Sequence, residues 1–153
     1  MKQPYISKSL SNNYITPKSI IQKYCGTLDI FDPCPYCEGE PLIDGLLSDW
    51  DLDRVVFVNP PFSHLKQWSQ KVYEQSLRGC RIVLLAPART DAIYFKKWVL
   101  AKADFLIFSK RISFISKERP EMTAPAPLSI VFAFYNMEPK AEYLSQFVLF
   151  GRL

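Results

Sequence analysis

The stretch Val55-Val-Phe-Val-Asn-Pro-Pro-Phe-Ser63 is a continuous apolar run that ends in a proline-rich turn. Its apolar half predicts a buried strand, and the carboxyl end of such a strand is the edge at which α/β proteins bind ligands. Two prolines fix the backbone of the turn and remove two N–H donors. The turn therefore presents the side-chain oxygen of Asn59, the carbonyl oxygen of Pro60 and the ring of Phe62. Two acceptors beside an aromatic ring suit a planar group that donates an NH₂, such as adenine.

Apolar runs and helix signals alternate on either side of this stretch. Three helices are predicted: one with Thr16 as N-cap and Gly26 at its end, one capped by Ser63 and closing at Gly79, and one over residues 91–102. Strands are predicted at residues 28–32, 55–58, 81–86, 105–108, 112–115, 128–135 and 147–150. This order predicts an α/β fold with a mostly parallel sheet and antiparallel edge strands.

The size and composition of the chain fit one compact domain. It has 153 residues, of which 48% are hydrophobic, enough to bury a core. We expect residues 1–153 to form a single domain, with residues 120–127 as an extended loop that meets the substrate. The chain lacks a long uncharged apolar run and begins without an apolar stretch. We therefore expect no membrane association, no secretory signal and a cytoplasmic location, in the host cell if the protein is encoded by a phage or virus.

The charge is mildly basic, at +4. Lysines and arginines gather in the first 23 residues and in residues 96–119, whereas residues 27–53 are acidic. Each basic group is either an ordinary solvated face or a contact surface for a polyanion, and the sequence leaves both interpretations open.

The cysteines are interpreted as reduced thiols. Cys34 and Cys37 have the CxxC spacing of a zinc half-site or a redox dithiol. A zinc site needs a second pair of ligands, and only the unpaired Cys25, Cys80 and His64 remain. Acidic residues after Cys37 would raise thiol pKa values and oppose redox chemistry. We therefore expect no metal, and a CxxC redox protein is the least favoured alternative.

Several further segments, in their order along the chain, resemble the phage-type (Dam-like) DNA adenine-N6 methyltransferases, which use S-adenosylmethionine. These segments are Tyr14-Ile-Thr-Pro17, Asp32-Pro-Cys34, Asp44-Gly-Leu46 followed by Trp50, Asn59-Pro-Pro-Phe62, Pro87-Ala-Arg-Thr-Asp91 and Lys110-Arg-Ile-Ser-Phe114. The resemblance as a whole covers residues 14 to about 134. The resemblance implies a single-domain Rossmann-like class I methyltransferase fold, without a separate target-recognition domain.

One departure concerns the turn after the first strand, where many methyltransferases carry glycines. Here that turn reads Asp32-Pro-Cys-Pro-Tyr-Cys37, and the next glycine is Gly39. The phage-type branch tends toward Asp-Pro-Cys at this place, so the departure fits that branch.

The resemblance also implies roles for individual residues. The cofactor S-adenosylmethionine would be bound by Tyr14, Thr16, Pro17, Asp32, Pro33, Asp44, Gly45 and Leu46. The catalytic turn would be Asn59, Pro60, Pro61 and Phe62, and DNA phosphates would be bound by Arg89, Lys110, Arg111 and Lys117. Purely structural roles stay open for the cofactor residues: a helix start at Thr16, a bend at Asp32 and a turn at Asp44.

Other functions remain open at this point. The Asn-Pro-Pro-Phe form is shared with methyltransferases that act on RNA adenine or on protein glutamine. A catalytically inactive nucleic-acid-binding module would keep the same fold. His64 either faces water or helps to release a proton. A small chain favours short or relaxed DNA specificity, unless a homodimer supplies more surface.

Overall fold

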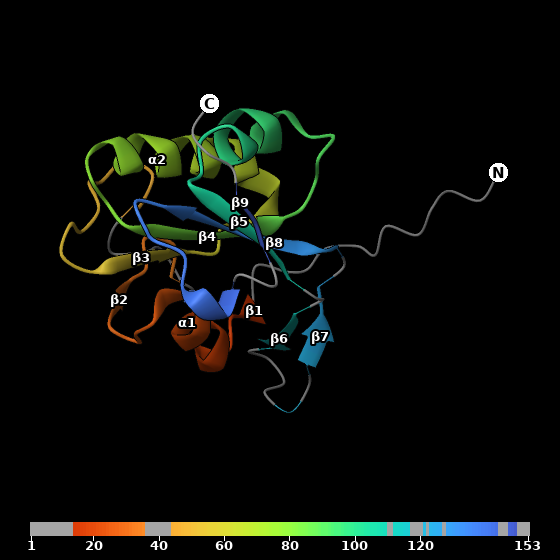
Figure 1. Cartoon of the computed structure of the whole chain (residues 1–153). Helices are drawn as coiled ribbons and strands as arrows, with labels where there is room; N and C mark the ends of the chain where they lie inside the picture. The colour runs from red at the N-terminus through yellow and green to blue at the C-terminus, as the bar shows by residue number, and fades with distance from the viewer. Residues whose placement is uncertain are drawn as a thin grey trace.

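Within the residues that it describes, the computed structural model of the chain contains two β-sheets, with helices packed around the larger one (Figure 1). The described residues are 14–35, 44–109, 112–116, 121, 123–126, 128–143 and 147–149. The larger sheet has the strand order β2-β3-β4-β8-β5-β9. Its strands are β2 (Ile30–Phe31), β3 (Val55–Val58), β4 (Ile82–Pro87), β5 (Phe105–Ser109), β8 (Ile130–Tyr135) and β9 (Phe147–Leu149). The α/β class predicted from the sequence is confirmed.

The strand before the proline turn lies in the interior of this sheet. β3 pairs in parallel with β2 on one side and with β4 on the other, and Val56 lies opposite Ile82. All four residues of β3 and all six of β4 are buried. The two apolar runs thus pair in parallel, and their burial fits strands covered on both faces.

The prediction of a mostly parallel sheet with antiparallel edge strands is confirmed only in part, because the sheet is mixed, with two parallel and three antiparallel pairings among the strands that the structure describes. β8 runs antiparallel to both of its neighbours, β4 and β5, inside the sheet. The physical reason is its composition, because all six residues from Ile130 to Tyr135 are apolar or aromatic and all are buried. Such a strand needs cover on both faces and partners on both sides. β9, which pairs antiparallel with β5, is the antiparallel strand at the edge.

A second, three-stranded antiparallel sheet has the order β1-β6-β7. Its strands are β1 (Tyr14–Ile15), β6 (Ser113–Ser116) and β7 (Thr123–Pro125). Tyr14 lies opposite Ser116, so the start of the described chain is held by a segment about a hundred residues later. The expectation that residues 120–127 form only an extended loop is wrong for residues 123–125, which pair with β6.

Helices cover both faces of the larger sheet (Figure 1). They are α1 (Lys18–Cys25), η1 (Phe62–His64), α2 (Leu65–Leu77), η2 (Phe95–Leu100) and η3 (Ala141–Tyr143). α2 and η2 pack on one face, and α1 and η3 pack on the other. This arrangement gives the sheet a separate hydrophobic core on each side.

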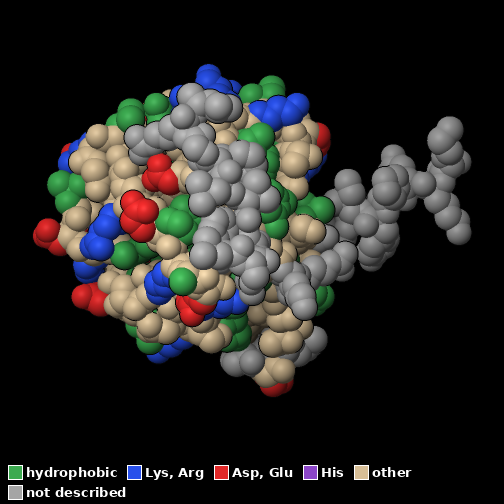
Figure 2. All heavy atoms as spheres, viewed as in Figure 1, with side chains coloured by type: hydrophobic (Ala, Val, Ile, Leu, Met, Phe, Trp, Pro, Cys, Tyr) green, Lys and Arg blue, Asp and Glu red, His purple; other side chains and the backbone are tan. Residues whose placement is uncertain are grey.

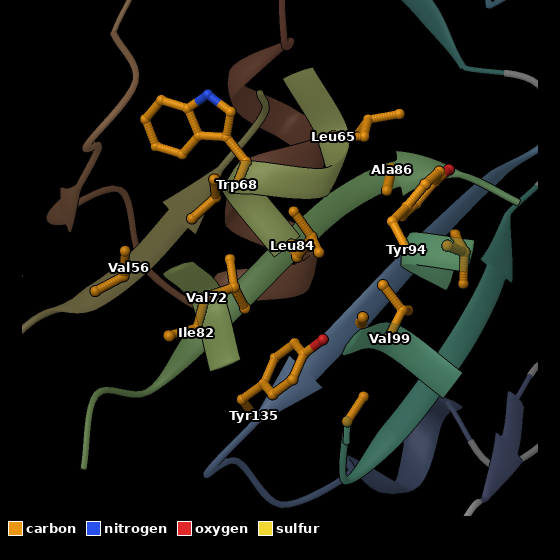
Figure 3. Close-up of a cluster of buried hydrophobic side chains, with 14 of the residues drawn as sticks. Val56, Leu65, Trp68, Val72, Ile82, Leu84, Ala86, Tyr94, Val99 and Tyr135 are labelled. Atoms are coloured by element: carbon orange, nitrogen blue, oxygen red, sulfur yellow. The ribbon is translucent and has the colours of Figure 1, made fainter. Parts of the chain in front are cut away.

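The alternation along each strand divides the side chains between the two cores. Val56 and Val58 of β3 join the core under α2, whereas Val55 and Phe57 join the core under α1. Figure 3 shows the first of these cores, where side chains of α2 and η2 point toward those of β3 and β4. Phe62, directly after the proline turn, contacts both cores. The turn is therefore anchored at the point where the two layers meet.

The first two helices begin differently from the prediction. The N-cap residue of α1 is Pro17, with no side-chain cap, because the hydroxyl of Thr16 is bonded elsewhere. Ser63 does not cap α2 either, because it lies within the 3₁₀ turn η1 and its Oγ contacts Nδ1 of His64. The predicted stop of the first helix is confirmed: Gly26 has φ +75°, and its N–H donates to the carbonyl of Gln22.

The third predicted helix is present in part, with a different winding. η2 is a π-helix, in which Phe95 and Val99 are buried against the sheet. The carbonyl of Trp98 accepts a hydrogen bond from the hydroxyl of Tyr135, which ties η2 to β8. The apolar face was predictable, but this contact from the other end of the chain was not.

Candidate functional site

Three parallel strands end at one edge of the larger sheet, and each is followed by a residue singled out in the sequence. Asp32 follows β2, Asn59 follows β3 and Arg89 lies two residues beyond β4. Phe31 pairs with Val56, so Asn59 lies two residues further along than Asp32. The backbones of these two residues are therefore about 5 Å apart across the sheet and about 7 Å apart along it. This edge is where α/β proteins bind ligands.

The proline turn after β3 is tightly fixed. Pro60 is buried, and Asn59 and Phe62 are half-buried. The carbonyl of Pro61 accepts a hydrogen bond from the N–H of His64 at 3.0 Å, which starts η1 and then α2. Prolines at two successive positions hold φ near −65°, so the turn keeps its shape without N–H donors of its own.

The side chain of Asn59 is oriented by Thr16. Nδ2 of Asn59 donates to Oγ1 of Thr16 at 3.0 Å, across 43 residues of sequence. Within the described parts of the chain, we find no hydrogen bond to Oδ1 of Asn59 or to the carbonyl oxygen of Pro60. The turn thus retains the two acceptors predicted from the sequence, and one of them is held in a fixed direction.

The residues predicted to bind the cofactor form two groups, one at residues 14–17 and one at residues 32–33 and 44–46. In the first, Thr16 lies against the proline turn, with Pro17 half-buried at the start of α1. Tyr14, in β1, is placed beside Ser116 by its backbone; its side chain lies outside the described part of the structure. Within this group, Thr16 is the residue that the structure shows in contact with the proline turn.

The second group is formed by the segments around Asp32 and Asp44. Each carboxylate accepts a hydrogen bond from the backbone N–H two residues later, at 2.9 Å, so each begins a local turn. Gly45 is pressed against the carbonyl oxygen of Pro33, and a Cβ added at Gly45 would lie 2.0 Å from that oxygen. Leu46, half-buried, packs against the core under α2. The glycine is therefore required by close contact between two backbones.

Burial affects the charge on Asp32. Its side chain reaches the surface, but enough protein surrounds the carboxyl group to raise its pKa by desolvation, and the N–H of Cys34 partly offsets that effect. Only Oδ1 is engaged in the hydrogen bond to Cys34. A cationic amine beside Asp32 would favour the charged form of its carboxyl group.

Two residues outside the predicted site hold the turn at Asp44. Nε1 of Trp50 donates to the carbonyl of Gly45 at 2.8 Å, and the N–H of Trp50 donates to Oε1 of Gln75 at 2.9 Å. Gln75, on α2, is buried. Trp50 was noticed in the sequence only as part of a motif, and Gln75 was missed. The available signal was the position of Gln75 on the same helix face as Trp68 and Val72, at a spacing that predicts burial.

The predicted phosphate-binding residues are only partly described. Arg89 is exposed and forms an ion pair with Asp91, at 2.8 Å. Lys110, Arg111 and Lys117 lie outside the described residues. On the face that Figure 2 presents, basic and acidic side chains are interspersed. Of the predicted phosphate-binding residues, Arg89 is therefore the one that the structure describes. To bind a phosphate, its guanidinium must break the ion pair with Asp91 or contact both groups at once.

Cys25 and Cys80 are free thiols. Cys25 and Cys80 are buried, and burial raises the pKa of Cys25 to about 12. Cys37 lies outside the described residues, so the CxxC pair is not placed. Among the side chains that the structure describes, no group of three His, Cys, Asp or Glu could hold a metal ion. His64 is exposed and contacts Ser63.

In the described ranges, no helix has both the length and the apolar character needed to cross a membrane.

Comparison with known proteins gives one match. The family model described as DNA N-6-adenine-methyltransferase (Dam) matches residues 35–146, which is more than half of the chain and includes the proline turn. No curated protein and no solved structure matches the chain.

Proposed function

The chain belongs to the DNA N-6-adenine-methyltransferase (Dam) family, and from this premise we propose that it transfers a methyl group from S-adenosylmethionine to the N6 amine of adenine in DNA through the Asn59-Pro-Pro-Phe62 turn. The observation that carries the proposal is the state of Asn59. Its amide nitrogen is engaged by Thr16, while its oxygen and the carbonyl oxygen of Pro60 have no donor within the described residues.

Two acceptors would activate the amine directly. The N6 amine of adenine is a weak nucleophile because its lone pair is delocalised into the ring. Oδ1 of Asn59 and the carbonyl oxygen of Pro60 would each accept one N6 hydrogen, which favours a pyramidal nitrogen and localises the lone pair. S-adenosylmethionine supplies a methyl group on a positively charged sulfur, a good leaving group. The new N–C bond would form as the S–C bond breaks, the sulfur would leave as a neutral thioether, and the amine would then lose one proton to solvent or to a nearby acceptor.

Phe62 would position the base. In a duplex, the target adenine must leave the stack, at a cost of a few kcal/mol. The half-buried ring of Phe62, held by both cores, offers a rigid face on which the base can stack. Correct placement of the amine relative to the methyl group is itself a large part of the rate gain.

The cofactor would bind along the same edge. Asp32, which has one carboxylate oxygen engaged in its own turn and a raised pKa, fits the cationic amine of the methionine part. Asp44, with Gly45 and Leu46, would contact the ribose or adenine, and Tyr14, Thr16, Pro17 and Pro33 would complete the wall. The close contact of Gly45 with Pro33 supports a single surface built from both segments.

We also propose that the larger sheet is of the Rossmann-like class I methyltransferase type, in one domain. The support is the run of parallel strands β2, β3 and β4, with the candidate ligand residues at their carboxyl ends. A methyltransferase that acts on RNA adenine or protein glutamine would use the same acceptor pair. The family match favours DNA over both.

One experiment separates these acceptors. The purified protein is incubated with methyl-labelled S-adenosylmethionine and with DNA, RNA or a protein extract, and the labelled DNA is then hydrolysed to nucleosides. We expect the label in DNA, where it should be recovered as N6-methyl-2′-deoxyadenosine. Label in RNA or protein alone would identify the competing acceptor, and no transfer together with no cofactor binding would identify an inactive module.

A further inference from the structure

The hydrogen bond between Asn59 and Thr16 joins two unusually rigid positions. Each residue directly precedes a proline, Pro60 and Pro17 respectively, and a residue before proline is confined to extended backbone. Thr16 is 5% exposed, and its branched side chain has few rotamers available. Its backbone is held between β1, which pairs with β6, and the first turn of α1. The hydroxyl therefore has a fixed place relative to the proline turn.

The direction of the Asn59 amide matters for the chemistry. A primary amide has an acceptor end and a donor end. With Nδ2 bonded to Thr16, Oδ1 lies on the opposite side of the amide and can accept from an amine. The reversed amide would turn its NH₂ toward the target, where two sets of N–H donors would repel each other.

We propose that Thr16 is a positioning residue for methyl transfer, whose hydroxyl oxygen holds Oδ1 of Asn59 toward the N6 amine. This inference rests on the proposed function of the Asn59-Pro60 acceptor pair. It gives Thr16 a task distinct from lining the cofactor site and distinct from capping α1, since α1 has no side-chain cap. It also explains why a polar side chain is buried at this position beside the turn.

Two substitutions isolate the hydroxyl. Thr16→Val keeps the shape and branching of the side chain but removes the acceptor, whereas Thr16→Ser keeps the hydroxyl and removes a methyl group. The rate of a single turnover on DNA and the affinity for S-adenosylmethionine are measured for both variants and for the wild type. We expect Thr16→Val to slow methyl transfer by about tenfold to a hundredfold with little change in cofactor affinity, and Thr16→Ser to recover most of the rate.

Other outcomes would overturn the inference. A wild-type rate in Thr16→Val, or equal losses in the Val and Ser variants, would remove the hydroxyl from the mechanism. Loss of cofactor affinity as the main effect of Thr16→Val would limit Thr16 to its proposed place in the wall of the cofactor site. Failure of the proposed function is recognised separately, because the wild type itself would then leave adenine unmethylated.

A measurement on the wild type covers the case in which Thr16→Val does not fold. The side-chain NH₂ of Asn59, assigned in a ¹⁵N-labelled sample by its absence in Asn59→Ala, is compared with that of the exposed Gln67. We expect solvent exchange of the Asn59 amide protons to be about tenfold slower or more, as one of them is held by Thr16. Equal exchange rates at Asn59 and Gln67 would contradict the bond on which the inference depends.

Discussion

Nε1 of Trp50 donates a hydrogen bond to the carbonyl oxygen of Gly45, and this bond fixes the turn that follows Asp44 against the end of β2. Gln75 holds the backbone of Trp50 in turn. A side chain from α2 therefore determines, through one tryptophan, how two acidic segments of the candidate cofactor site lie against each other.

Gly45→Ala is expected to weaken binding of S-adenosylmethionine and to lower the melting temperature, since the new Cβ would lie 2.0 Å from the carbonyl oxygen of Pro33. Trp50→Phe should have a smaller effect of the same kind, because it removes one hydrogen bond worth about 1 kcal/mol. Trp68→Phe is the matched control: its ring stacks near Trp50 in the same core. Calorimetry that finds equal losses of cofactor affinity in Trp50→Phe and Trp68→Phe would show that the bond to Gly45 is not needed.

Asp32→Ala is expected to reduce cofactor affinity by roughly tenfold to a hundredfold, because a charge-assisted contact with the amine is lost. The pKa of Asp32 is raised by burial, so affinity in the wild type should fall as the pH drops through that raised value and the carboxylate becomes neutral. Asp32→Asn should bind weakly at every pH. Calorimetry across a pH series measures both effects.

Ionisation of Asp32 should favour cofactor binding but should lower the stability of the protein without cofactor. A carboxyl group whose pKa is raised in the folded state holds its proton more tightly there than in the unfolded state, so its contribution to stability declines as the pH rises through the raised pKa. Asp32→Asn should therefore melt at a higher temperature than the wild type at neutral pH. A lower melting temperature would assign Asp32 a stabilising structural role.

Arg89→Ala is expected to weaken DNA binding and to lower the slope of log affinity against log salt by about one unit, the value for one lost phosphate contact. Asp91→Ala is the informative partner, since it frees Arg89 from its ion pair. Affinity for DNA should rise in Asp91→Ala and return to the Arg89→Ala value in the double variant. If the salt slope is unchanged in all three variants, Arg89 does not contact a DNA phosphate and serves only as the ion-pair partner of Asp91.

The parts of the fold that were predictable depend on local signals. The apolar run of β3 and the two prolines after it specify a buried strand and a rigid exit, and Gly26 specifies a helix end. These features depend on backbone rules that operate over a few residues. The position of β8 in the sheet could not be predicted from local signals, because it depends on which of the apolar strands takes a position that is buried on both faces.

The same limit applies to the candidate site. Hydroxyl side chains at Thr16 and Ser63 were interpreted as helix caps because that is their commonest local use. In the structure, Thr16 instead bonds to a residue 43 positions away. Sequence resemblance brought together the proline turn and the two acidic segments, but the contacts of Trp50 with Gly45 and Gln75 depend on tertiary packing.

Phe62→Ala is expected to weaken productive binding of the target base, at a cost of about 1–3 kcal/mol for one lost stacking surface. Phe62→Tyr and Phe62→Trp should keep much of the activity, because a flat ring is the required feature. Since Phe62 also contacts both cores, melting temperatures must be compared alongside the kinetics. If Phe62→Ala is less stable but methylates DNA at the wild-type rate, Phe62 has a packing role and does not stack on the target base.

The most direct test of the central claim is the rate of a single turnover of Asn59→Ala on DNA, measured with its affinity for S-adenosylmethionine. Asn59 would contact the amine and not the cofactor, so its loss should appear in the chemical step. We expect the rate of N6 methylation to fall by about a hundredfold to a thousandfold or more, as when one preorganised polar contact to the reacting group is removed, while cofactor affinity stays close to that of the wild type. Methylation of adenine at the wild-type rate by Asn59→Ala would contradict the claim that this acceptor pair is the catalytic device and would leave the turn as a rigid strand exit.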